Sequence, residues 1–581
     1  MKRYKAHENG ATLVLASVVK VDGSAKEWLT RLIACSSQAI VVLPVILTFG
    51  RLEARSWVVL AAIAVAAATT GRVLDIPSIV GVSVSMASIA VLCVEATTGS
   101  FRLGGSAFGF ALVASVTVAT FCVRAINGPS HELSTLAPSA LVLSALMLPT
   151  LGATEVTGLS RIVGNFGEDN GAWLIALARS SEGASTVLTD ASGNHGGPAT
   201  GFMLATVRFI NGLLRSGDVS GLQSNGLVLY RAYLLVAVIA CLVAAAIASR
   251  LTEHWGRLTA SASGMAAAVV VFSFSMGLVT VGHFSALVAV ACGLTSLRVL
   301  VGRQERTRRG LSASVAAVCL VAVGQSWFPL TGVGLIFTAV LGVTWLVTTI
   351  RGRSIRQLIV TLSLSFLVVL VIAWILYVYV LDTYLQNVID FSYILDNLRL
   401  AGGYPNLRIE VGFLVLLVGV HLVFRPVSDE GMKLLVGAAV GSFLLPLLFL
   451  LVVTFAVPPH IPQYGLYKYL YIFAAVVAPL GIGLAVRVSE GRLGPGARAS
   501  IPIMTALGFL LLAPPGDKFG WTDMSRATSN DWAVAVVSEI GANPDRVVGC
   551  LNTRRGDTDN DYQAYFCSRI AFGLAGRDSL P

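Results

Sequence analysis

Charged residues are scarce in this chain. Only 12% of its 581 residues are Asp, Glu, Lys or Arg, whereas 55% are hydrophobic. Soluble globular chains carry about 25% charged residues, so the composition excludes an ordinary soluble domain and predicts a polytopic membrane protein. The formal net charge of +10 does not indicate nucleic-acid binding. The arginines fall in short loops between apolar runs, where they orient a protein in the bilayer.

The common catalytic fingerprints are also missing. No P-loop, GxSxG, HExxH or dinucleotide-binding glycine pattern occurs in a supporting context, which argues against the enzyme classes that these motifs mark. The eight cysteines form no CxxC pair and show no zinc spacing. The N-terminal sequence, with Lys2, Arg3 and Lys5, lacks the apolar core and cleavage site of a signal peptide.

Long apolar runs fill most of the chain. A spanning helix needs about 20 apolar residues. By this length rule we expect an all-α polytopic membrane protein with about 13–15 transmembrane helices. The runs lie near 32–50, 57–71, 77–95, 105–124, 135–152, 226–248, 262–281, 283–300, 311–329, 331–350, 358–380, 411–424, 431–457, 466–486 and 500–513. They divide the chain into N-terminal transmembrane helices (1–152), an outer-face loop (153–225), a transmembrane core (226–513) and a C-terminal cap (514–581).

The arginine-rich loops set the expected orientation. The loops from Arg298 to Arg309 and from Arg351 to Arg356 are the most basic, and such loops alternate with poorly basic ones such as 457–465. The positive-inside rule places the basic loops in the cytoplasm. We therefore expect a multi-pass cell-membrane protein with a cytoplasmic N-terminus and an extracytoplasmic C-terminus.

The C-terminal tail differs from the rest of the chain. Residues 531–541 have helical periodicity and end at a glycine, whereas residues 546–551 have the pattern of a buried strand. We expect a small extracytoplasmic α/β cap, which is too small to bury a large core by itself. An outward location would allow a disulfide between Cys550 and Cys567.

The loop 153–225 carries an acidic pair. Glu168 and Asp169 lie side by side, ahead of an amphipathic run that contains Trp173. Such a run can place the carboxylates at the water–lipid boundary, and a helix N-terminus favours an anion there. The alternative is that the two acids belong to a solvated surface.

Two histidines are candidate substrate-binding residues. His195 lies in the sequence GNHGGP, whose glycines allow close backbone approach to a ligand but equally form an ordinary turn. His283 lies in a very short turn between two apolar runs. It lines an outward cavity or merely caps a helix hairpin.

The sequence PPHIPQYGLYKYL (458–470) places Lys468 at or within a late spanning helix. An intramembrane lysine is costly unless it is paired or hydrated, so it indicates a functional site. The alternative is snorkelling of the side chain to the nearby surface. With His460, Tyr464 and Tyr467, Lys468 would form a cationic, hydroxyl-rich site suited to the phosphate of a lipid.

Taken together, these features resemble the GT-C glycosyltransferases, and in particular the actinobacterial cell-wall arabinofuranosyltransferases. The shared features are the many spans, the acidic pair Glu168-Asp169 in a long outer loop, the YGLYKYL motif near the last spans and the outer C-terminal cap. The likeness covers roughly residues 130–581. One departure is that about five apolar segments, by the length rule, precede the acidic loop, which the family commonly carries after its first span.

The resemblance implies a sugar donor carried on a polyprenyl phosphate and an outer-loop aspartate that acts as general base. Here that base would be Asp169, and Glu168 would orient the acceptor or a metal. One carboxylate suffices to deprotonate an attacking hydroxyl. A phosphate leaving group needs only a cation to stabilise its charge. No cofactor is assigned with certainty, and a divalent cation is left open.

We therefore expect a glycosyltransferase that moves a sugar from a polyprenyl-phosphate donor to a cell-envelope glycan or glycolipid acceptor. Its partners are this donor, this acceptor and membrane lipid, with no nucleic acid. One alternative is a polysaccharide polymerase or ligase acting on lipid-linked glycans, which would rely on arginine and histidine. A second is a lipid or solute transporter, which should show inverted repeats.

Overall fold

The computed structural model describes residues 36–37, 39–48, 76–98, 105–127, 133–157, 173, 198–214, 222–281, 283–301, 309–327, 330–351, 430–456, 464–488 and 493–512. Nearly all of these residues are helical, and none of them lies in a strand. The helices are α4 (Ile76–Thr98), α5 (Gly105–Asn127), α6 (Leu133–Thr157), α9 (Pro198–Leu214), α10 (Leu222–Thr252), η1 (Glu253–Trp255), α11 (Arg257–Val281), α12 (Phe284–Val301), α13 (Arg309–Ser326), α14 (Thr331–Arg351), α18 (Glu430–Ala456), α19 (Tyr464–Val488) and α20 (Pro495–Leu512).

The apolar runs of the sequence correspond closely to these helices. The run expected at 283–300, for example, becomes α12, Phe284–Val301. Four described helices contain stretches long and apolar enough to cross a membrane: Val228–Trp255, Arg257–Val279, Phe284–Val301 and Lys468–Arg487. The all-α, membrane-type character expected from the sequence is therefore confirmed.

The finer expectation of about 13–15 spans is not reached in the described part of the chain. Other described helices, such as α13, contain shorter apolar stretches. The runs expected at 57–71, 358–380 and 411–424 lie outside the described residues. So does the cap expected at 514–581 with its Cys550–Cys567 disulfide. The α/β character of that cap gains no support, and the disulfide stays a prediction.

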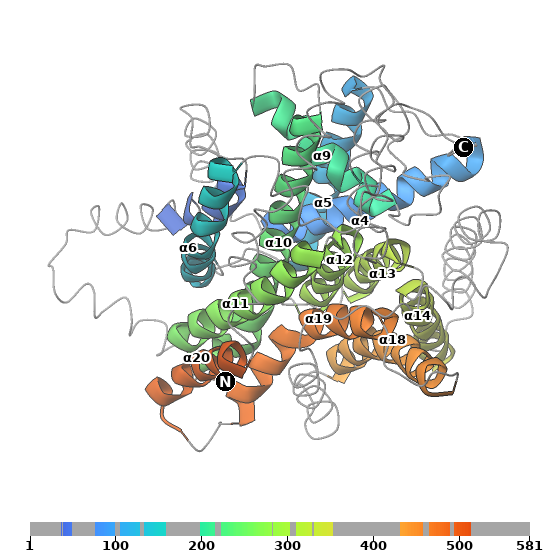
Figure 1. Ribbon diagram of the computed structural model, residues 1–581. Helices are drawn as coiled ribbons and strands as arrows, with labels where there is room; N and C mark the ends of the chain where they lie inside the picture. Colours follow the sequence, from blue (N-terminus) through green and yellow to red (C-terminus); the bar gives the residue numbers. More distant parts are fainter. Residues whose placement is uncertain are drawn as a thin grey trace, which may run out of the picture.

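Helix α10 lies near the middle of the bundle (Figure 1). It packs against α6, α11, α12 and α19. All its residues from 228 to 249 are buried, because its sequence is apolar on every side and such a helix is stable only when other helices surround it. The large hydrophobic core is built around this helix.

The outer faces of several helices are apolar. Val113 and Phe121 of α5 are 65% and 70% exposed. Inside the bundle, hydroxyl groups turn back onto their own helix: Ser144 and Thr206 each donate a hydrogen bond of 2.8 Å to the carbonyl oxygen four residues earlier. Apolar outer faces suit a lipid environment, and these two hydroxyls are satisfied within their own helices.

Helix α9 was not expected from the sequence. The segment 153–225 was interpreted as a polar outer loop, yet it contains this helix, whose Phe202, Met203 and Val207 are buried. Pro198 begins the helix, because its fixed φ suits the first turn and its missing N–H is not needed there. The helix packs against α4 and α10, so this part of the segment belongs to the core of the bundle.

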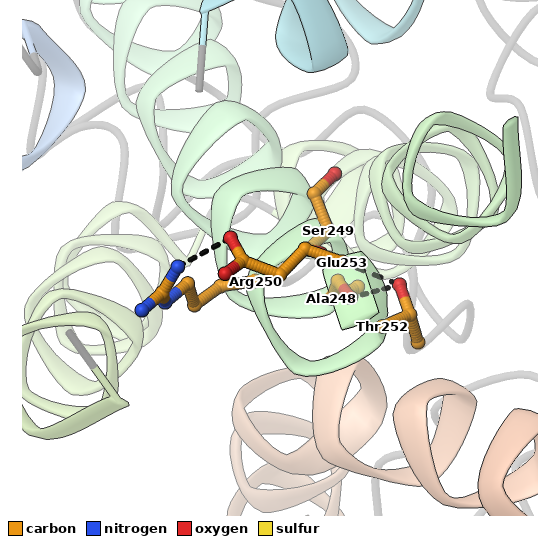
Figure 2. A network of polar contacts seen from close by, with 5 residues as sticks. All are labelled: Ala248, Ser249, Arg250, Thr252 and Glu253. Atoms are coloured by element: carbon orange, nitrogen blue, oxygen red, sulfur yellow. Dashed lines mark hydrogen bonds and ion pairs between the residues drawn. The ribbon is translucent and has the colours of Figure 1, made fainter. Parts of the chain in front are cut away.

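A short hairpin joins α10 to α11, and Figure 2 shows the polar contacts that finish α10. Arg250 forms an ion pair with Glu253, one turn further along. The hydroxyl of Thr252 donates a hydrogen bond of 2.8 Å to the carbonyl oxygen of Ala248. These contacts hold the last turn of α10 in place as the chain passes into η1.

The reversal itself occurs at Gly256. Its backbone has φ 107° and ψ 160°, a combination that is almost restricted to glycine. The hydroxyl of Ser249 crosses the hairpin to the carbonyl oxygen of Ala260, at 2.9 Å. We call this end of the bundle the Gly256 end.

The opposite end of the bundle is marked by His283, which joins α11 to α12, and we call it the His283 end. Helix α19 can be oriented between the two ends. Its Gly483 packs against Leu251 of α10, next to the Gly256 end. The first turns of α19, with Lys468, therefore lie at the His283 end.

Candidate functional site

Lys468 is buried inside the bundle. Its side chain is 4% exposed, and its Nζ lies 4.9 Å from the ring centre of Trp327. Trp327 directly follows α13, so two elements that are distant in the sequence form this contact. The face of an indole ring attracts a cation, most strongly where water is excluded.

The neighbours of Lys468 in α19 hold it in this position. The hydroxyl of Tyr469 donates a hydrogen bond of 2.7 Å to the carbonyl oxygen of Phe443 in α18. On another side of the helix, Tyr471 lies edge-on to Phe274 of α11, with ring centres 4.9 Å apart. Lys468 is thus carried by a helix that is pinned on two sides, and its burial follows from this packing.

Helices α12 and α19 place Phe284 at the same depth in the bundle as Lys468. Gly293 of α12 packs against Val476 of α19, and both helices run from the His283 end to the Gly256 end. At a rise of 1.5 Å per residue, Phe284 lies about 13 Å from Gly293 along α12, toward the His283 end. Lys468 lies about 12 Å from Val476 along α19, in the same direction. Phe284 and Lys468 therefore lie at nearly the same level of the bundle.

Phe284 is the centre of an aromatic cluster. Tyr233 of α10 lies edge-on to it at 4.9 Å between ring centres. Trp173 also lies edge-on to it, at 6.0 Å between ring centres and an interplanar angle of 75°. Trp173 is 5% exposed, and its indole N–H has no hydrogen-bond partner within the described part of the chain.

His283 lies beside this cluster and is 5% exposed. Its backbone N–H donates to the carbonyl oxygen of Leu278 at 2.9 Å, and its own carbonyl accepts from the N–H of Leu287 at 3.1 Å. The residue thus closes α11 and opens α12. Its backbone caps the helix hairpin, which is one of the two roles expected from the sequence. The buried side chain is compatible with that role and with the other one, lining a cavity.

The structure brings together only some of the residues singled out from the sequence. Lys468 and His283 are both buried at the His283 end. Tyr464 and Tyr467 lie in the first turn of α19. Glu168, Asp169, His195 and His460 lie outside the described residues, together with Cys550 and Cys567.

The sequence interpretation overlooked Trp327, Tyr469 and Tyr471. Trp327 carried a usable signal, because tryptophan is enriched where a spanning helix meets the membrane surface. Tyr469 and Tyr471 are part of the same tyrosine-rich segment as Lys468. Spacing within that segment does not show which tyrosine packs and which faces a ligand.

The described residues contain no group of three or more His, Cys, Asp or Glu side chains that could hold a metal ion. Comparison of the chain with protein-family models, with curated proteins and with solved structures finds no match. The class of the protein therefore rests on its own features. It is a helical protein of membrane type with a buried cation and an aromatic cluster at one end of the bundle.

Proposed function

We propose that this protein is a membrane glycosyltransferase that transfers a sugar from a polyprenyl-phosphate donor to a cell-envelope glycan or glycolipid. The observation that carries the proposal is the burial of Lys468 at the His283 end, against the ring of Trp327. In this proposal the His283 end faces the outside of the cell, where nucleotide sugars are absent and a lipid must carry the donor sugar.

Lys468 would bind the phosphate of the donor. A buried ammonium group is costly, and its retention within a spanning helix is characteristic of functional sites. During transfer the bond between the sugar and the phosphate breaks, and negative charge develops on the phosphate oxygen that leaves. A fixed cation in a site of low dielectric constant stabilises that charge without a proton being supplied. His460, Tyr464 and Tyr467 would contribute further hydrogen bonds to the phosphate.

Asp169 would act as the general base that removes the proton from the acceptor hydroxyl. The position of Trp173 supports this role. Trp173 contacts Phe284, which lies at the depth of Lys468, and Asp169 precedes it by four residues. Four residues span at most about 14 Å, so the chain can bring the carboxylate to the same end of the bundle. Glu168 would orient the acceptor or a divalent cation, and His195 and His283 would contact substrate.

A polymerase or ligase acting on lipid-linked glycans is the second candidate. Arg231 of α10 is 5% exposed and lies two residues from Tyr233, which contacts Phe284. Buried arginine and histidine at one end of the bundle are the residue types on which such an enzyme would rely. The two candidates differ in whether the carboxylate of Asp169 is required.

Binding of a lipid phosphate tests the proposal directly. The full chain would be placed in lipid nanodiscs, and its affinity for decaprenyl phosphate would be compared with that of Lys468→Met, which keeps a long apolar side chain but removes the charge. Loss of a charged hydrogen bond should weaken binding by about tenfold or more. Arg487→Met, near the other end of the same helix, is the matched control and should bind normally. Unchanged binding by a folded Lys468→Met variant would remove the main support for the proposal.

A further inference from the structure

Trp173 carries a buried hydrogen-bond donor, its indole Nε1, that has no partner within the described part of the chain. Trp173 is 5% exposed, and its Nε1 is inaccessible to solvent. An indole N–H can donate but cannot accept. A buried donor without a partner costs free energy, and such groups in native structures call for an explanation. A ligand that brings an acceptor atom to this position would provide one.

The surroundings of Trp173 narrow the chemistry of that ligand. The ring rests edge-on against Phe284, and Phe284 in turn contacts Tyr233. Hydrocarbon alone would satisfy these rings but would leave the N–H unpaired. The ligand must therefore bring an oxygen, or another acceptor, into an aromatic site that already excludes water.

Trp173 and Lys468 are placed to contact different parts of one ligand. Phe284 and Lys468 lie at the same depth, by the helical count from Gly293 and Val476. Helices α12 and α19 pack against each other, and packed helices have axes about 8–10 Å apart. Trp173 contacts the ring of Phe284, whereas Lys468 lies against the ring of Trp327, which follows α13. A ligand that bonds to both must offer an acceptor to the indole N–H and an anionic group to the ammonium.

We propose that the indole N–H of Trp173 donates a hydrogen bond to an oxygen of the sugar on the lipid-linked donor, while Lys468 holds the phosphate. This inference rests on the function proposed above and assigns to Trp173 the recognition of the sugar. It predicts that Trp173 contributes to binding of the glycosylated lipid and not to binding of the bare lipid phosphate.

Two substitutions separate the hydrogen bond from the packing. Trp173→Phe keeps an aromatic ring against Phe284 but removes the N–H. Replacement of Trp173 by benzothienylalanine keeps the size of the indole and exchanges the N–H for sulfur, so it serves if the smaller ring disturbs folding. Trp255→Phe is the matched control, because the N–H of Trp255 also lacks a partner in the described structure. Trp255 lies at the Gly256 end, tilted against the ring of His254 with ring centres 3.5 Å apart.

The measurement compares two affinities for each variant of the full chain in nanodiscs. The probes are decaprenyl phosphate and the same lipid phosphate carrying arabinose, mannose or glucose. The wild type should bind at least one of the sugar-bearing lipids more tightly than the bare phosphate. Both Trp173 variants should weaken that binding about three- to tenfold, as expected for one lost hydrogen bond. They should leave the affinity for decaprenyl phosphate unchanged, and Trp255→Phe should change neither affinity.

Other outcomes overturn the inference in distinguishable ways. If both Trp173 variants bind the sugar-bearing lipid like the wild type, Trp173 does not recognise the sugar, and the proposed function is unaffected. The same conclusion follows if the variants weaken binding of the bare and the sugar-bearing lipid equally, because Trp173 then contributes only to packing. If the wild type binds none of the lipid phosphates, the proposed function and this inference fail together.

Discussion

The Nζ of Lys468 lies 4.9 Å from the ring centre of Trp327. One residue comes from the start of α19 and the other from the end of α13, so the contact joins two helix ends that meet only in the folded bundle. The ring stabilises an ammonium group that is withdrawn from water.

The contact between Lys468 and Trp327 should be measurable as a coupling energy. Trp327→Leu and Lys468→Met, made singly and together, should show an interaction of about 0.5–2 kcal/mol in the free energy of unfolding. Trp327→Phe should retain most of it, because an aromatic face remains. Denaturant unfolding in detergent micelles measures each variant. Strictly additive effects of the two substitutions would show that the contact contributes nothing.

Tyr471 and Gly277 pack so closely that a larger residue at 277 requires the ring of Tyr471 to shift. A Cβ on Gly277 would overlap the hydroxyl of Tyr471, so Gly277→Ala should push α11 and α19 apart. We expect a loss of about 1–3 kcal/mol in the free energy of unfolding, as for other overpacked cores. Gly342→Ala in α14 is the control, because nothing lies within 4 Å of its added Cβ. It should be neutral or stabilising by up to about 1 kcal/mol. Equal effects of the two substitutions would contradict this account of the α11–α19 interface.

Asp169→Asn should abolish most of the sugar transfer. It preserves size but removes the basic oxygen, and loss of a general base costs about 10²-fold or more in rate. Glu168→Gln should have a smaller effect. The assay follows transfer of radiolabelled sugar from a polyprenyl phosphate to a glycan acceptor. Near-normal transfer by Asp169→Asn, together with inactivity of Arg231→Gln, would favour the polymerase or ligase instead.

The orientation in the membrane has its own test. Reporter fusions at Arg306 and after Asp517 should report opposite sides of the membrane, with Arg306 in the cytoplasm. The physical reason is that the arginine-rich loop around Arg306 is retained on the cytoplasmic side. The same side for both fusions would exclude the proposed topology and, with it, an outward-facing His283 end.

The sequence by itself determined where most of the described helices lie, α9 excepted, and that their apolar surfaces are suited to lipid. In a bilayer core the backbone N–H and C=O groups must be hydrogen-bonded, and an apolar run of about 20 residues satisfies them within one segment by forming a helix. For that reason α12 could be located to within a residue at each end. The cost of a charge in such a helix also singled out Lys468 before any contact was known.

Only the tertiary structure decided which helices are neighbours, because apolar spanning helices have similar surfaces and no pattern within one of them identifies its partners. It placed α10 at the centre of the bundle. It also showed that the segment interpreted as a polar loop contains a buried helix, α9. It set Trp327 against Lys468 and Trp173 against Phe284. These contacts depend on the packing of side chains from distant segments, and no pattern within a single segment specifies them.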